Sequence, residues 1–175
     1  MKKVVLLVAT LSLGFTYAQQ APKLVIPKVE VTPKNSWFKA GLTAGVPMSD
    51  TKDVASFNVG VDVRAQYLFT AHFAVGVASG YNHFFAKDEI EDFGVIPLAG
   101  FARYYFQKEG LFIGTDFGYG FLSNVENNDG GLYINPQIGY HNRDWNFYGF
   151  YQNTFTDAIN IRSLGLGATY NIRFK

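Results

Sequence analysis

Apolar and polar residues alternate strictly along residues 57–67. Every odd position there is apolar or aromatic, and every even position is Asn, Gly, Asp, Arg or Gln. Because successive side chains of a β-strand point to opposite faces, the segment predicts a strand with one apolar and one polar face. The alternation alone leaves open whether the apolar face meets a protein core or lipid.

Seven further segments show the same kind of alternation, so the chain carries eight candidate strands of about 11 to 14 residues each. Strands of soluble proteins average about 5–6 residues, whereas membrane strands need about 9–11 residues at a tilt near 45°. The strand length therefore favours a membrane protein. The candidate strands are 36–46, 56–69, 72–84, 94–106, 111–122, 131–141, 145–155 and 162–174.

The connectors between these strands alternate between long and short. Longer polar or acidic connectors follow the odd-numbered strands, and tight ones follow the even-numbered strands. This is the pattern of outer-membrane barrels, which have long loops outside and short turns in the periplasm. We therefore expect an all-β, eight-stranded, antiparallel, up-and-down transmembrane β-barrel over residues 36–175. The seventh strand is ambiguous, because both its faces carry aromatic residues.

Aromatic residues gather near both ends of the expected strands, as bilayer interfaces select. One expected girdle, at the side of the short connectors, holds Trp37, Phe38, Tyr67, Phe69, Phe73, Tyr104, Phe106, Tyr140, Trp145, Tyr170 and Phe174. The other holds Phe57, Tyr81, Phe84, Phe93, Phe121, Tyr133 and Phe155. The alternative architecture is a soluble barrel of lipocalin type, which would need charged residues outside and apolar residues inside.

The beginning of the chain reads as an export signal. Lys2 and Lys3 precede an apolar stretch, and small residues before Gln19 resemble a cleavage site. The apolar stretch is well short of the roughly 20 residues that a spanning helix needs. We expect a signal peptide over 1–18 and a proline-containing periplasmic linker over 19–35. Without the signal the chain has a net charge near −1, which gives no indication of nucleic-acid binding, and it contains no cysteine.

The polar face of the expected strands is made mostly of Gly, Asn, Gln, Ser and Thr, which suits a narrow interior. An arginine facing lipid at the bilayer midplane costs about 2–4 kcal/mol, so the strand charges are expected to face inward. Eight strands leave an interior that side chains can fill. We expect a plugged lumen in which the two carboxylates pair with the three cations. This lumen charge network consists of Lys39, Asp62, Arg64, Arg103 and Asp116.

Three segments, 96–106, 133–140 and 164–174, resemble the Bacteroidetes-type outer-membrane β-barrel domain family. The resemblance implies the fold and the location and says almost nothing about activity. In such families the last strand ends in an aromatic residue that the barrel assembly machinery reads. Here that signal would be Tyr170, Ile172 and Phe174, although Lys175 follows the last aromatic residue.

Candidate chemistry is sparse. No metal-protease or nucleophile-elbow spacing occurs, and the expected set of catalytic, cofactor-binding and metal-binding residues is empty. His83, with Asp88 or Ser79, is the one candidate for lipid-A modification, and a solvated histidine at the rim is the competing interpretation. Nine of the fourteen acidic residues lie in the longer connectors. They suit either divalent cations bridging to lipopolysaccharide or simple solvation.

These features favour a monomeric, non-enzymatic protein of the bacterial outer membrane with a structural or interaction role. Its partners would be outer-membrane lipid and lipopolysaccharide, and the barrel assembly machinery during biogenesis; it would use no cofactor. The alternatives are a small-solute channel and a lipid-A-modifying enzyme.

Overall fold

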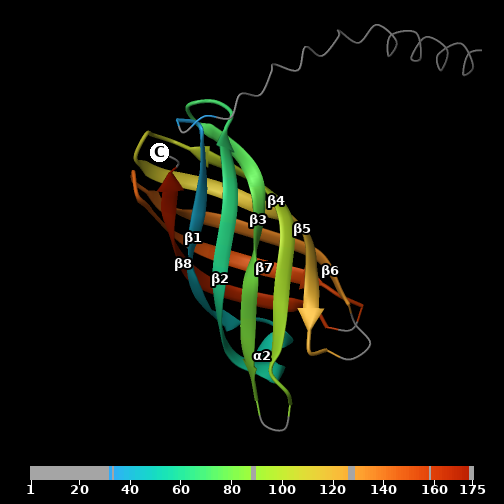
Figure 1. Cartoon of the computed structure of the whole chain (residues 1–175). Helices are drawn as coiled ribbons and strands as arrows, with labels where there is room; N and C mark the ends of the chain where they lie inside the picture. The colour runs from blue at the N-terminus through green and yellow to red at the C-terminus, as the bar shows by residue number, and fades with distance from the viewer. Residues whose placement is uncertain (1–31, 33, 88–89, 126–128, 158, 174–175) are drawn as a thin grey trace, which may run out of the picture. The chain divides into compact units, whose positions relative to one another are not determined.

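Eight antiparallel strands form a closed barrel in the computed structural model, in which each strand pairs with the next and β8 pairs with β1 (Figure 1). The structure describes residues 32, 34–87, 90–125, 129–157 and 159–173. The strands are β1 (Ser36–Pro47), β2 (Ala55–Leu68), β3 (Phe73–Ala86), β4 (Phe93–Tyr105), β5 (Gly110–Ser123), β6 (Gly130–His141), β7 (Trp145–Phe155) and β8 (Ile161–Arg173). The expected eight-stranded up-and-down barrel is confirmed, and each strand boundary lies within two residues of its expected place.

The two ends of the barrel differ in their connectors. We call the end where β1 begins and β8 ends the terminus end, and the opposite end the loop end. The loop end carries a short helical turn, α2 (Thr51–Val54), which the sequence pattern did not predict. Thr51 Oγ1 donates to Asn160 O and accepts the Arg162 N–H, both at 2.9 Å. This turn is therefore held by a connector distant in sequence, which no local pattern reveals.

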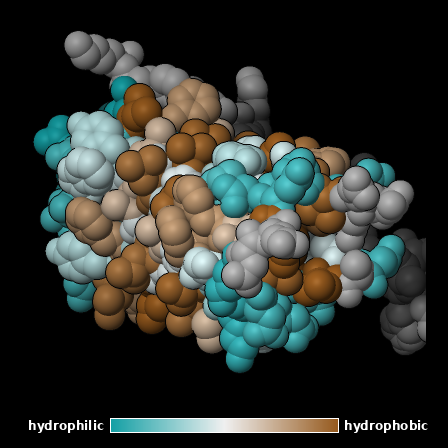
Figure 2. All heavy atoms as spheres, turned by 90° about the horizontal axis from the view of Figure 1, so that it is seen from below, coloured by the Kyte–Doolittle hydropathy of each residue, from teal (hydrophilic) through white to brown (hydrophobic). Residues whose placement is uncertain are grey.

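The outer face of the barrel is apolar. Leu42 and Leu166 are 68% and 72% exposed, and alternate residues of every strand add exposed Val, Ile, Phe and Tyr side chains. Figure 2 shows one face of the molecule, where hydrophobic residues form a broad zone bordered by hydrophilic ones. Soluble monomers rarely expose apolar patches larger than a few hundred Å², so this surface suits lipid. No helix in the described part of the chain is long and apolar enough to cross a membrane.

The faces of β7 are settled by burial. Trp145, Phe147 and Tyr151 are exposed on the outside, whereas Tyr148 and Phe150 are buried inside. The inner face of β7 therefore combines these two rings with amide and hydroxyl side chains. Aromatic character on both faces is what made this strand ambiguous in sequence.

The expected aromatic girdles are partly wrong. Exposed rings do surround both ends, but four of the assigned residues are buried inside the barrel. They lie on the inward side of the alternation, where large rings fill the lumen instead of contacting lipid headgroups. These four are Trp37, Phe84, Phe93 and Tyr133.

Val61→Arg tests which face meets lipid. Val61 is 47% exposed near the middle of β2, where an arginine facing lipid costs about 2–4 kcal/mol. We expect a lower folded fraction in phosphatidylcholine vesicles, read as the heat-modifiable band on gels across a urea series. Val61→Leu should fold like the wild type; equal folding of Val61→Arg would contradict the assignment.

Candidate functional site

The five charged residues expected in the lumen are all buried. Lys39, Asp62, Arg64, Arg103 and Asp116 are between 1% and 7% exposed and come from β1, β2, β4 and β5. Their alternation with outward apolar residues places them inside. The barrel wall therefore encloses three cationic and two anionic side chains.

Arg64 joins the two carboxylates. Its Nε donates to Asp62 Oδ2 at 2.9 Å, while Nη1 and Nη2 donate to the two oxygens of Asp116 at 2.6 and 2.9 Å. The bidentate geometry is the strong form of an arginine–carboxylate pair. The guanidinium also lies 5.3 Å from the centre of the Phe101 ring. Arg64 thus binds one carboxylate on its own strand, β2, and another on β5 across the lumen.

Neutral side chains complete this central group. Asn135 and Gln137 of β6 donate to Asp116 Oδ2 at 3.0 and 2.8 Å. The Tyr148 hydroxyl of β7 donates to Asp62 Oδ2. Buried carboxylates need such additional donors to offset the loss of water. The central cluster, defined as Asp62, Arg64, Asp116 and these three donors, therefore draws on four strands.

Arg103 does not pair with a carboxylate in the described part of the chain, which differs from the expectation. Its Nη2 donates to Gln137 Oε1 at 2.6 Å, and its guanidinium lies 4.6 Å from the Phe112 ring centre and 5.5 Å from that of Tyr148. Arginine stacks readily on aromatic faces. The adjacent Gly114 makes room, since a Cβ there would lie 2.6 Å from Arg103 Cγ.

Lys39 likewise has no carboxylate partner among the described residues. Although Lys39 and Arg64 are register partners, the Lys39 Nζ donates toward the terminus end, to Tyr105 Oη and Asn146 Oδ1, both at 2.9 Å. The two neighbouring cations thus separate along the barrel axis, because Arg64 binds both carboxylates in the centre. Which cation obtains the carboxylates depends on side-chain reach across the lumen, and the sequence pattern does not contain that information.

Apolar and aromatic side chains pack on both sides of the central cluster, which the sequence interpretation missed. Toward the terminus end, Tyr105, Phe112, Tyr148 and Phe150 pack together. A cavity of about 20 Å³ remains beside Arg64, which is room for about one water molecule. The signal for these rings was present: β4, β5 and β7 each carry aromatic residues on both faces.

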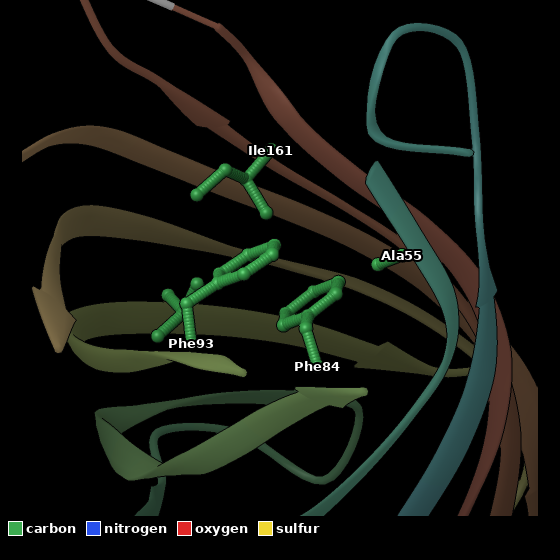
Figure 3. Packing of buried hydrophobic residues seen from close by; sticks show 5 residues of the cluster. Ala55, Phe84, Phe93 and Ile161 are labelled. Carbon is green, nitrogen blue, oxygen red and sulfur yellow. The ribbon is translucent and has the colours of Figure 1, made fainter. Parts of the chain in front are cut away.

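Toward the loop end, a second apolar cluster lies inside the barrel. Phe84 and Phe93 stack with ring centres 5.0 Å apart, and Ile161 and Ala55 pack against them (Figure 3). Beyond this cluster lies a hollow of about 420 Å³ lined mainly by aliphatic side chains of the connectors and strand ends. The loop end is thus apolar where its connectors meet the barrel.

His83 lies on the outside of the barrel near the loop end. Its Nδ1 lies 3.1 Å from Tyr81 Oη, and its Nε2 lies 3.1 Å from Asp92 Oδ2. The structure therefore places His83 with Asp92 and Tyr81 instead of Ser79, while Asp88 lies outside the described residues. Asp92 also accepts the Ala86 N–H at 2.8 Å. The arrangement fastens the β3–β4 connector to the end of β3.

The acidic connectors show no candidate metal site within the described part of the chain. Among the described residues, no group of three or more His, Asp or Glu side chains is close enough to hold a metal ion. Asp88, Glu89 and Glu126 lie outside those residues. In the expected assembly signal, Tyr170 and Ile172 are exposed on the outer face, and Phe174 also lies outside the described residues.

Comparison with known proteins supports the fold. No protein-family profile matches the chain, and no curated protein matches it. Among solved structures, Ail, the attachment invasion locus protein of Yersinia pestis, is similar with a TM-score of 0.58 and 12% identity, over 79% of this chain and 98% of Ail. Neisserial surface protein A is similar with a TM-score of 0.55 and 16% identity, over 79% of this chain and 97% of that protein.

A de novo designed transmembrane β-barrel matches with a TM-score of 0.51 and 14% identity, over 82% of this chain and all of the design. At such identities the likeness shows the fold alone, which is that of small outer-membrane β-barrels. It does not bear on a Bacteroidetes-type family. That assignment stays a prediction.

Arg64→Met tests the central cluster. The substitution leaves Asp62 and Asp116 without their cation, and breaking a buried pair from one side costs about 3–5 kcal/mol. We expect a clearly lower urea midpoint for unfolding from vesicles. Lys52→Met, at an exposed position of α2, should change stability by less than about 0.5 kcal/mol; an equally small effect of Arg64→Met would show that the ion pairs contribute nothing.

The connector anchor at Asp92 has a defined pH dependence. The Ala86 N–H, with a further contribution from His83, holds the pKa of the Asp92 carboxyl below its usual range. Because this pKa is depressed, the anchor is present at and above the ordinary aspartate pKa of about 3.9 and is lost as the pH falls through the lower value. A carboxyl ¹³C titration should give a midpoint below 3.9, and His83→Phe should move that midpoint partly back. A midpoint at or above the ordinary aspartate value would contradict this.

Proposed function

We propose that the protein is an integral outer-membrane β-barrel with a closed lumen, which stabilises the membrane and presents its acidic connectors at the cell surface. The observation that carries this proposal is the central cluster, in which Arg64 links Asp62 to Asp116 across the barrel. It places an arginine and two carboxylates across the lumen. A chain built this way acts through its surface and not through a pore.

The outer-membrane location rests on three features together. The outer face is apolar around the barrel, exposed aromatic residues lie near the strand ends, and the chain begins with a segment of signal-peptide character. In outer-membrane barrels the short turns are periplasmic. The terminus end would then face the periplasm and the loop end the outside.

The closed lumen is supported by packing as well as charge. The central cluster lies between the two apolar clusters, and the cavity beside it has room for about one water molecule. A small-solute channel, the main alternative, would need a continuous aqueous path past Phe84 and Phe93 at one end and Phe112 and Tyr148 at the other. Side-chain rearrangement would have to open that path.

A non-enzymatic role fits the rim chemistry. His83 has a carboxylate on one nitrogen and a phenol on the other. Asp92 and Tyr81 thus engage both ring nitrogens and leave neither for the serine that a hydrolytic site would require. These two contacts explain His83 as an anchor of the β3–β4 connector. Lipid-A modification therefore stays the weaker alternative.

The finer assignments are part of the same proposal. The strand patterns in 96–106, 133–140 and 164–174 resemble those of the Bacteroidetes-type barrel family, and we include membership of that family in the proposal. Tyr170, Ile172 and Phe174 would be read by the barrel assembly machinery, and lipopolysaccharide would contact the outer leaflet portion of a monomeric barrel. The acidic residues of the connectors would either face its phosphates through divalent cations or be simply solvated.

Planar bilayer recordings test the closed lumen. Purified wild-type protein should show no steady single-channel steps, because the interior is packed. A variant with Phe84→Ala, Phe93→Ala, Phe112→Ala and Tyr148→Ala, which removes rings from both apolar clusters, should show measurable leak once its heat-modifiable band confirms folding. Stable unitary currents from the wild type would replace the proposal with the small-solute channel.

A further inference from the structure

A hollow of about 710 Å³ opens at the terminus end of the barrel. Its lining carries cations from five different positions and one acidic side chain, that of Glu109. The cationic residues are Lys34, Lys39, Lys108, Arg143 and Arg173. A cleft lined by one sign of charge focuses its field and concentrates counter-ions. The charge balance therefore points to an anionic occupant.

The floor of the hollow holds donors that lack an anionic partner. Lys39 is 1% exposed, and its Nζ donates only to the neutral Tyr105 and Asn146 within the described part of the chain. Trp37 is 8% exposed, and its buried Nε1–H has no hydrogen-bond partner among the described residues. Burying an ammonium without a countercharge is costly, and so is burying an unpaired donor. An anion in the hollow would relieve both costs.

The rim adds the guanidinium group of Arg173, which is already partly fixed. Arg173 lies with its guanidinium 4.8 Å from the Trp37 ring centre, and its Nη2 donates to the Arg143 carbonyl at 3.1 Å. Asn171 Nδ2 donates to the same carbonyl at 2.9 Å. These contacts hold the Arg173 guanidinium over the Trp37 ring. Preorganised arginines of this kind suit bidentate oxyanions.

We propose that this hollow binds a phosphate group. A phosphate offers several strong acceptor oxygens to convergent donors, whereas a single carboxylate offers two; the lysine, arginine and indole donors here exceed what one carboxylate satisfies. The site is separate from the central cluster, whose carboxylates are already bound by Arg64. It gives the terminus end a binding role of its own.

The position of the hollow suits the phosphate of a lipid headgroup. Exposed rings surround the barrel near this end, among them Tyr104, Phe106, Trp145 and Tyr170, and such belts mark the headgroup level. Basic pockets at that level bind anionic lipid headgroups in other membrane proteins. A free phosphate-bearing solute shares the same chemistry. The experiment distinguishes these two sources.

Trp37 provides the signal, since the chain has only two tryptophans and Trp145→Phe leaves Trp37 alone. The folded variant in dodecyl maltoside is titrated in separate arms with inorganic pyrophosphate, with short-chain phosphatidylglycerol, and with the matching diacylglycerol that lacks phosphate. We expect a saturable fluorescence change with the phosphate-bearing probes and none with diacylglycerol. Binding at least tenfold tighter for phosphatidylglycerol identifies the headgroup; equal or tighter binding of pyrophosphate identifies a free phosphate.

Two sets of variants locate the site. Lys39→Met and the exposed rim pair Lys108→Gln/Arg143→Gln should each weaken binding at least tenfold, and the rim pair keeps the test valid if Lys39→Met fails to fold. The matched control Lys52→Gln/Lys87→Gln removes two cations at the loop end and should bind like its parent. Absence of a saturable change, unaltered binding in the folded terminus-end variants, or equal weakening by the control would each overturn the proposal.

Discussion

The contact between Arg64 and its two carboxylates governs how this barrel can be filled. A charged group inside the barrel loses its water, and attraction to a partner offsets that loss only when the geometry is good and the remaining lone pairs are satisfied. Arg64 meets the condition by binding Asp62 along β2 and Asp116 across the lumen. Since Asp116 belongs to β5, the pair fixes the separation of strands that are not neighbours in the barrel.

The two apolar clusters give that contact its strength. Rings and aliphatic side chains lie on either side of the charges, one group containing Phe84 and Phe93 and the other Phe112 and Tyr148. Excluding water lowers the local dielectric, so that paired charges attract more strongly and unpaired ones become more costly. Polar centre and apolar ends are therefore parts of one arrangement. The same rings that shield Arg64 also provide the faces on which Arg103 stacks.

The sequence predicts the structural features that near neighbours along the chain determine. It does not predict those that depend on residues far apart in the sequence. Strand positions and faces are set by neighbours two residues apart, so alternation predicted them closely. The burial of Trp37 and Phe93 was missed because an aromatic residue near a strand end suits either an interface or a filled lumen. The partners of Lys39 and Arg103 depend on reach between strands that are not adjacent, and α2 depends on a distant connector; no local pattern encodes either.

The described interior holds more buried cations than carboxylates, and this difference explains why the environment of the charges changes along the barrel axis. Among the described residues, three cationic side chains and two carboxylates are buried. Arg64 binds both carboxylates, so Arg103 and Lys39 are left without one. Arg103 is stabilised by aromatic faces, which tolerate a guanidinium better than they tolerate a strongly hydrated ammonium. Lys39 has two neutral partners and lies at the floor of the basic hollow. Among the described residues, Arg64 thus holds both carboxylates in the centre, whereas Lys39 at the terminus end has only neutral partners, so stability and the proposed phosphate binding depend on different residues.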